Sequence, residues 1–146
     1  MREKRIVTAA LTGAIHTPSM SPHLPVTPEE LIEQAVQAYE AGAAVAHVHV
    51  RNPETGLPCA DQELFRTFAA GVKSRCDMII CCTTGGRLGE PVENRVRVVT
   101  SLSPELATLN AGSLNFALFH IADNYRDWKQ DWEKNYLQAT EDFIFP

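Results

Sequence analysis

The sequence predicts an α/β fold in which helices cover a parallel sheet. Short apolar runs with strand character alternate along the chain with segments whose apolar residues have helical spacing. Polar residues gather directly after each of these apolar runs. In parallel α/β folds the chemistry collects where the strands end, so this pattern has a functional side as well. We therefore expect repeated βα units, arranged either as a doubly wound sheet or as a barrel.

The first expected strand covers residues 5–11, and a loop rich in proline, serine and histidine follows it as far as residue 26. A helix then begins. Thr27 is its predicted N-cap, Pro28 its first residue and Glu30 the partner that completes a capping box. Gly42 is a plausible end for this helix. The next expected strand covers residues 44–51.

The later elements repeat the same alternation. After a turn at residues 52–56, Asp61 is expected to cap a helix that reaches about residue 74, and residues 77–82 form the third strand. Pro91 opens a helix that reaches about residue 100, and residues 106–110 form the fourth strand. The end of the chain is less regular, although Trp128 and Trp132 stand one helical turn apart, and residues 143–146 are mostly apolar.

The most informative feature is a pair of histidines, His47 and His49, inside an apolar strand. Side chains two apart in a strand share a face, so the two imidazoles lie side by side while Val48 and Val50 fill the other face. A divalent metal would use both as ligands, and Arg51 would suit an anionic substrate. From the spacing alone, backbone carbonyls or a carboxylate satisfy the two rings equally well.

Four consecutive strands deliver polar groups at one end of the sheet. The turn Thr83-Thr84-Gly85-Gly86 offers successive N–H groups and two hydroxyls, a concavity that suits a carboxylate or a phosphate. An ordinary Gly-Gly turn remains the alternative, and the turn is neither a P-loop nor a dinucleotide fingerprint. The polar residues at the four strand ends are Thr12 and Gly13, His47, His49 and Arg51, Thr83 to Gly86, and Asn110 to Ser113.

The composition narrows the range of partners. The 146 residues carry a formal net charge of -5 with no basic cluster, which argues against nucleic acid or an anionic membrane. No apolar stretch is long enough to span a bilayer, and no clear signal-peptide cleavage pattern follows the N-terminus, so we expect a cytoplasmic protein. The four cysteines show no CxxC spacing, and a disulfide framework is not expected.

Several of these motifs, in this order, closely resemble the β-keto acid cleavage enzymes. They are residues 8–14, 24–30, 41–44, 47–51, 83–86 and 109–116. The resemblance implies a zinc-dependent (β/α)8 TIM barrel that converts a β-keto acid and acetyl-CoA into acetoacetate and a new CoA thioester. It implies that His47 and His49 bind Zn²⁺. The resemblance and the strand-end pattern together give Thr83 and Thr108 as candidate catalytic residues. The candidate substrate-binding residues are Thr12, Arg51, Thr83, Gly85, Gly86, Thr108 and Asn110.

The sequence departs from the family pattern at one position of the expected site. Many family members carry a glutamate directly after the Thr-Gly-Ala of the first strand, and this chain has Ile15 there. An apolar side chain cannot pair with a substrate ammonium. We therefore expect a keto acid with an uncharged or apolar tail.

The length of the match is the second departure. Residues 1–146 correspond to the N-terminal half of the barrel domain, about four βα units, and the family's glutamate metal ligand, catalytic arginine and catalytic aspartate have no matching position. Three hypotheses follow: an enzyme whose barrel a partner chain or remainder completes, a metal- or carboxylate-binding half-barrel without turnover, and a self-associating interaction module. In each case open sheet edges predict a homo-oligomer or a partner chain.

Overall fold

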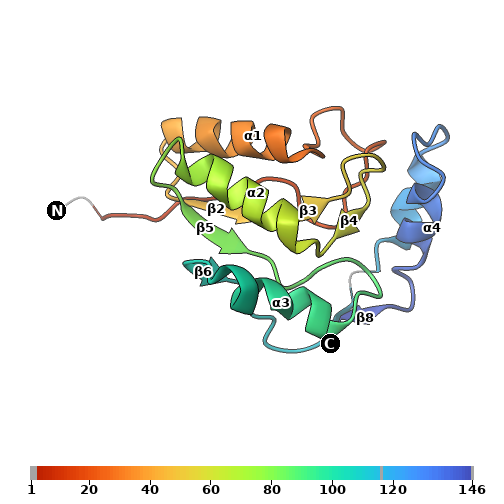
Figure 1. Cartoon of the computed structure of the whole chain (residues 1–146). Coiled ribbons are helices and arrows are strands. Elements are labelled where there is room, and N and C mark those ends of the chain that lie inside the picture. Colours follow the sequence, from red (N-terminus) through yellow and green to blue (C-terminus); the bar gives the residue numbers. More distant parts are fainter. Residues whose placement is uncertain (1–2, 116, 146) are drawn as a thin grey trace.

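The computed structural model describes residues 3–115 and 117–145. Its centre is a four-stranded parallel sheet in the order β1-β2-β5-β6, which is also the order of these strands along the chain (Figure 1). The strands are β1 (Thr8–Ala10), β2 (Val45–Val48), β5 (Ile79–Cys82) and β6 (Leu106–Ala107). The helices between them are α1 (Pro28–Glu40), α2 (Gln62–Lys73) and α3 (Val92–Leu102).

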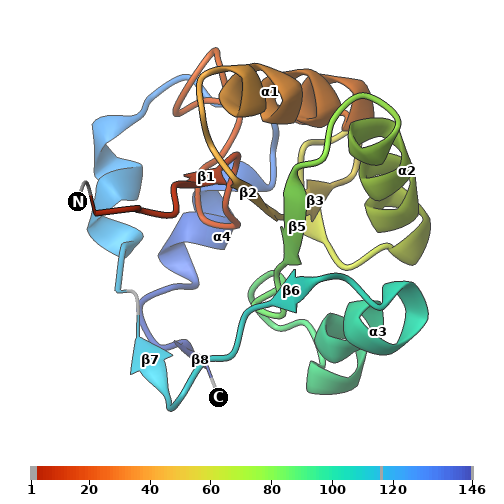
Figure 2. The same cartoon turned by 90° about the vertical axis from the view of Figure 1, so that its left-hand side faces the viewer.

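All three helices lie on the same side of the sheet, and each packs against the next (Figure 2). A doubly wound sheet would reverse its strand order and place helices on both faces. Sequential parallel strands with every helix outside are instead the first half of a (β/α)8 barrel. The predicted fold class is confirmed, as far as the four βα units that the chain supplies.

The core lies between the sheet and the helices. Alternate strand residues point outward to the helices, among them Ala46, Val48, Ile80 and Cys82, which are all almost fully buried. They pack against apolar side chains of the helices, chiefly Leu31, Ala35, Phe65, Phe68, Val72 and Val98. The intervening residues point to the opposite side of the sheet, which is the interior side of a barrel.

The inner face of the sheet is only partly covered in this chain. Ile79 is 38% exposed and Leu106 is 46% exposed, although both are strand residues. The register aligns Ala10, His47, Cys81 and Leu106 across the four strands. His47 therefore stands in a row of inward-pointing side chains, as the alternation predicted.

The predicted helix starts are largely correct. Thr27 caps α1 with a complete capping box that includes Glu30, and the Asp61 carboxylate caps α2 by accepting from two backbone N–H groups. Pro91 opens α3 as its N-cap, and α3 continues to Leu102, slightly beyond the expected end near residue 100. Its C-cap, Ser103, has a left-handed backbone that ends the helix.

The expected strands are longer than the observed ones. The residues predicted as one strand over 44–51 divide into β2 and the short β3 (Val50–Arg51), which pairs antiparallel with β4 (Pro58–Cys59). The pairing of β3 with β4 closes the turn that Gly56 allows with its positive φ of 72°. The first and fourth strands likewise shrink to β1 and β6.

The C-terminal segment forms four elements that the sequence did not predict. They are β7 (Leu114–Asn115), the 3-10 helix η1 (Phe119–Asn124), α4 (Glu133–Gln138) and β8 (Ile144–Phe145). Trp132 is the N-cap of α4, but Trp128 precedes the helix, and Pro146 lies outside the described residues. The segment runs beside the loops that follow β1 and β5, well away from the three outer helices (Figures 1 and 2).

Two further expectations concern the cysteines and the membrane. All four cysteines are free thiols, as the spacing predicted. No helix in residues 3–115 and 117–145 combines the length and the apolar character that a membrane crossing requires.

Candidate functional site

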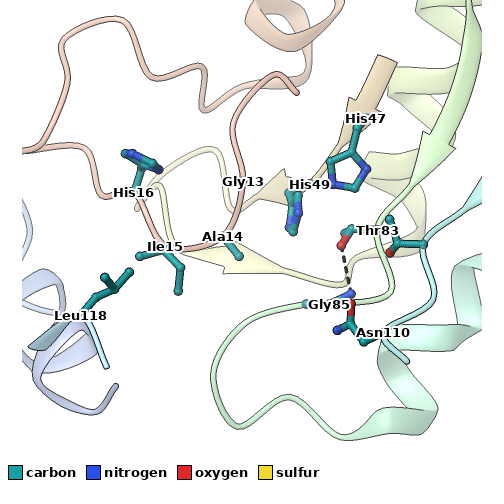
Figure 3. A pocket seen from close by; sticks show the side chains of 12 residues that line it. Gly13, Ala14, Ile15, His16, His47, His49, Thr83, Gly85, Asn110 and Leu118 are labelled. Carbon is teal, nitrogen blue, oxygen red and sulfur yellow. Dashed lines mark hydrogen bonds between the residues drawn. The ribbon is translucent and has the colours of Figure 1, made fainter. Parts of the chain in front are cut away.

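A cavity of about 430 Å³ lies at the carboxyl ends of the strands, on the inner side of the sheet (Figure 3). The strands and loops that line it come from four separate stretches of the chain, with one further residue from the C-terminal segment. Its lining residues are Gly13 to His16, His47, His49, Thr83, Gly85, Gly86, Thr108, Asn110 and Leu118. Seven sequence-predicted site residues are therefore brought together: His47, His49, Thr83, Gly85, Gly86, Thr108 and Asn110.

The two histidines lie next to each other in this cavity. Their ring centroids are 5.0 Å apart and the ring planes meet at 86°. Burial lowers the pKa of His47, although a hydrogen bond to the Cys81 backbone opposes that shift. The pKa of His49 is lowered to about 3, chiefly by burial and to a smaller extent by the neighbouring His47 and Arg51. Both imidazoles are therefore neutral at pH 7, which is the form that binds a metal.

The turn after β5 is held by its own hydroxyls. The Thr83 hydroxyl accepts a hydrogen bond from the Gly85 N–H at 3.0 Å, drawn as the dashed line in Figure 3. The Thr84 hydroxyl donates to the Thr108 carbonyl at 2.8 Å, and the Thr108 hydroxyl accepts from the Thr84 N–H at 2.9 Å. The ends of β5 and β6 are thus tied together, and the Thr83 hydroxyl keeps its proton available to a ligand.

Arg95 supports the same turn from behind. This arginine of α3 is buried and donates to the Gly85 carbonyl at 3.2 Å. Its side-chain carbons fill the space that a Cβ on Gly86 would occupy, at 2.7 Å, and Gly86 has a φ of 61°. Both facts favour glycine at position 86, so the second glycine of the pair has a structural reason that is specific to this turn.

Arg51 and Thr12 do not line the cavity, and their expected contact with substrate is therefore revised. Arg51 is completely buried, and its guanidinium donates to the Thr12 hydroxyl at 2.7 Å. It also donates to three backbone carbonyls, those of Gly13 (2.9 Å), His16 (2.8 Å) and Gly56 (2.8 Å). The arginine is satisfied by these acceptors, and it holds the loop after β1 in place.

The other side of the cavity carries two apolar side chains, with His16 beside them. Ile15 and Leu118 lie on one side, and His47, His49 and Asn110 on the other (Figure 3). Leu118 was missed by the sequence reasoning, because no local pattern indicates that the segment after β7 returns to the mouth of the sheet. The cavity therefore combines an apolar wall with a polar floor, the usual character of a site for a small molecule.

The described residues fit a metal only in part. Two neutral imidazoles are suitable ligands for zinc, but catalytic zinc sites in proteins have three protein ligands. Within residues 3–115 and 117–145 no group of three His, Cys, Asp or Glu side chains is placed to hold a metal ion. The histidine pair thus supplies part of a ligand set.

Comparison with known proteins agrees with this geometry. The profile of a family described as beta-keto acid cleavage enzyme matches residues 4–144. The chain is 42% identical over 144 residues to the 3,5-dioxohexanoate:acetyl-CoA acetone transferase of Paraburkholderia graminis, a match that covers 99% of this chain and 46% of that protein. It is 43% identical over 117 residues to the 3-keto-5-aminohexanoate cleavage enzyme of Fusobacterium nucleatum, covering 80% of this chain and 42% of that protein.

A solved structure is similar as well. The ternary complex of ObcA with a C4-CoA adduct and oxalate superposes with a TM-score of 0.55 at 25% identity, over 64% of this chain and 24% of the ObcA chain. The chain spans about half the length of the curated relatives it matches. The family match extends over nearly the whole chain, and it covers the two histidines and the Gly-Gly turn that form the cavity. This chain belongs to the beta-keto acid cleavage enzyme family.

Proposed function

We propose that this chain supplies the keto-acid-binding and metal-binding half of a β-keto acid cleavage enzyme. In the proposed reaction a β-keto acid and acetyl-CoA give acetoacetate and a new CoA thioester. The observation that carries the proposal is the cavity, in which two neutral imidazoles face the Thr83-Gly85-Gly86 turn. Family membership supplies the reaction class.

Zinc is the proposed cofactor. His47 and His49 would hold the ion, with a third ligand from residues beyond those described here. When bound, zinc would act as a Lewis acid toward the ketone of the substrate. The chemistry of the donors supports this, because both imidazoles are neutral and lie side by side on the cavity wall.

The chain's own residues would bind and orient the keto acid. The Thr83 hydroxyl has a proton to donate, since its oxygen is the acceptor in the bond from the Gly85 N–H. That proton would meet the carboxylate of the substrate. Asn110 and Thr108 would complete the polar side of the pocket. These are positioning contacts, which lower the barrier by fixing the reacting groups in place.

The apolar wall supports a substrate with an uncharged tail. Ile15 and Leu118 offer no countercharge to an ammonium, and burying an unpaired ammonium against them would be costly. The Paraburkholderia graminis relative is a 3,5-dioxohexanoate:acetyl-CoA acetone transferase, and beyond its carboxylate that keto acid has no charged group. The cytoplasm, where acetyl-CoA is available, is the proposed location.

We also propose that a second copy of the chain covers the open face of the sheet. Ile79 and Leu106 are exposed on this face, and Leu109, shortly after β6, is 89% exposed; exposed apolar patches of this kind mark interaction sites. Light scattering at micromolar concentration should give a dimer. A monomer that binds no hydrophobic dye would contradict the proposal.

The zinc assignment is tested by calorimetric titration of the metal-free chain. We expect weak binding that His47→Ala abolishes, because one imidazole cannot hold the ion alone. His23→Ala is the matched control, since His23 is exposed and lies outside the cavity. Equal zinc affinity in the His47 variant and the unmodified chain would rule out the ligand assignment.

The reaction is tested by incubating the protein with zinc, acetyl-CoA and a β-keto acid, and measuring acetoacetate and the new thioester by mass spectrometry. Turnover of 3-oxohexanoate should exceed that of 3-keto-5-aminohexanoate. Ile15→Glu should shift the preference toward 3-keto-5-aminohexanoate, because the introduced carboxylate offers a countercharge to the substrate ammonium. Equal turnover of both acids by the unmodified protein would contradict the role of Ile15.

A second candidate function is metal and carboxylate binding without turnover. The incomplete ligand set among the described residues favours it for the chain as it stands. Zinc binding together with saturable keto acid binding, but without thioester formation, would select this alternative.

A further inference from the structure

The loop that carries Ile15 is held almost entirely through its backbone. Arg51 donates to the carbonyls of Gly13 and His16 at 2.9 and 2.8 Å. The Tyr136 hydroxyl donates to the carbonyl of Ala14 at 2.9 Å. Three of the four carbonyls from residue 13 to residue 16 are thus fixed by side chains of two distant elements, β3 and α4.

Tyr136 reaches a second cavity loop as well. Its oxygen accepts a hydrogen bond from the Leu88 N–H at 3.4 Å, in the loop that continues from the Gly85-Gly86 turn. One hydroxyl therefore joins the loop after β1 to the loop after β5. These two loops form opposite sides of the cavity, with Ile15 on one and Gly85 on the other.

The position of the tyrosine is itself fixed. The Tyr136 ring packs edge to face against Trp132, with the ring centroids 5.5 Å apart. The Trp132 indole N–H in turn donates to the Thr55 carbonyl at 3.0 Å. Burial raises the pKa of the Tyr136 phenol, although the Leu88 N–H and the Arg51 charge oppose that shift. The hydroxyl is therefore protonated at neutral pH and donates its proton to the loop.

We propose that Tyr136 is a positioning residue for substrate selection, which sets the width of the cavity between Ile15 and the Gly-Gly turn. Arg51 shares the role by fixing the two ends of the same loop. The aliphatic side chain of Ile15 has no group that can form a hydrogen bond, so a change of residue at this position leaves the three carbonyl contacts in place. This inference rests on the proposed function for the identity of the ligand, but its geometric part does not.

The geometric part is tested on the isotopically labelled chain by NMR. In Tyr136→Phe the Leu88 N–H loses its acceptor, and its hydrogen exchange should accelerate about tenfold, which is the loss of one hydrogen bond. Order parameters at Ala14 and Ile15 should fall from about 0.85, the range of rigid backbone. Those at Gly13 and His16 should stay there, because Arg51 still holds them. Tyr39→Phe, at an exposed tyrosine of α1, is the matched control and should change none of these values.

The selectivity part is tested on the same variants with 3-oxohexanoate and 3-keto-5-aminohexanoate. Tyr136→Phe should bring the two affinities closer together, by about threefold or more, while zinc affinity stays unchanged. Ile15→Glu should change the preference but leave the order parameters of the loop as they were. Equal exchange at Leu88 in Tyr136→Phe and the unmodified chain would overturn the proposal. So would a loosened loop with an unchanged affinity ratio.

The two proposals fail in different ways. If the unmodified chain binds neither keto acid, the proposed function is wrong, while accelerated exchange at Leu88 and lower order parameters at Ala14 still establish that Tyr136 fixes the loop. If both acids bind and Tyr136→Phe leaves the loop rigid, the positioning role is wrong and the proposed function stands.

Discussion

The βα units and the C-terminal segment of this chain are stabilised in different ways. The hydrophobic core cluster draws all its fully buried members from residues 31–98. The segment after β7 contributes none of them. Its own buried apolar residues, Ala122 and Leu137, lie outside this cluster, and hydrogen bonds join the segment to the loops of the βα units. Glu133 accepts from the Ser19 N–H, Tyr136 donates to Ala14, and Trp132 donates to Thr55. The apolar core stabilises the βα units, and hydrogen bonds from the C-terminal segment hold the loops that line the cavity in place.

This difference predicts which substitutions affect the whole molecule. Phe68→Ala removes a completely buried side chain from the centre of the core and should lower the free energy of unfolding by about 3–5 kcal/mol. Ile79→Ala, on the open face of the same sheet, should cost only about 1 kcal/mol, since this side chain is 38% exposed. Urea denaturation measures both values. Similar losses for the two variants would mean that the inner face is packed as tightly as the outer one.

A substitution in the C-terminal segment should act locally. Glu133 is fully buried, and its carboxylate accepts from the N–H groups of Ser19 and Gln130 and from the Ser19 hydroxyl, at 2.8 to 3.0 Å. Glu133→Ala leaves these donors without an acceptor and should destabilise α4 by about 2–4 kcal/mol. Hydrogen exchange should accelerate in α4 and in the loop around Ser19.

The backbone amides of α2 are the internal reference for Glu133→Ala, and they should keep their exchange rates. Glu141→Ala, which removes an exposed carboxylate, is the matched control variant. If exchange accelerated equally in α2 and α4, the βα units and the C-terminal segment would unfold as one unit, and their local stabilities would not differ.

The same contrast explains what the sequence could predict of the fold. Helix caps and apolar periodicity are local signals, and they correctly located α1 and α2 from residues such as Thr27 and Asp61. The C-terminal segment gives no such signal. Its contacts with Ser19, Thr55 and Ala14 join residues 77 to 122 positions apart, and they are hydrogen bonds rather than an apolar stripe. Its elements could not be predicted from spacing.

The candidate site was predictable to the extent that strand alternation determines it. Alternation placed His47 and His49 on the inner face, and the ends of parallel strands brought Thr83 and Thr108 to the same cavity. Arg51 was misjudged because it belongs to β3, which leaves the parallel sheet to pair with β4. A sequence gives the position of a buried arginine along the chain, but the direction of its guanidinium depends on which carbonyls the fold presents.

The smallest expected effect concerns a surface ion pair within the βα units. Lys73 at the end of α2 contacts Glu105 before β6, and Glu105 also accepts from the Ile80 N–H at 3.4 Å. Partial burial alone would raise the pKa of Glu105, but these hydrogen bonds outweigh it and lower the pKa below the usual 4.5. A carboxyl whose pKa is lowered by folding stabilises the protein above its unfolded pKa, and that contribution is lost as the pH falls through the folded value.

The Lys73 and Glu105 side chains are both about 40% exposed, so solvent reduces the effect. Glu105→Gln should therefore cost less than about 1 kcal/mol at pH 7, and the cost should shrink as the pH falls toward 3, as measured by urea denaturation at the two pH values. A larger loss at pH 3 than at pH 7 would show that the side chain contributes through packing rather than charge.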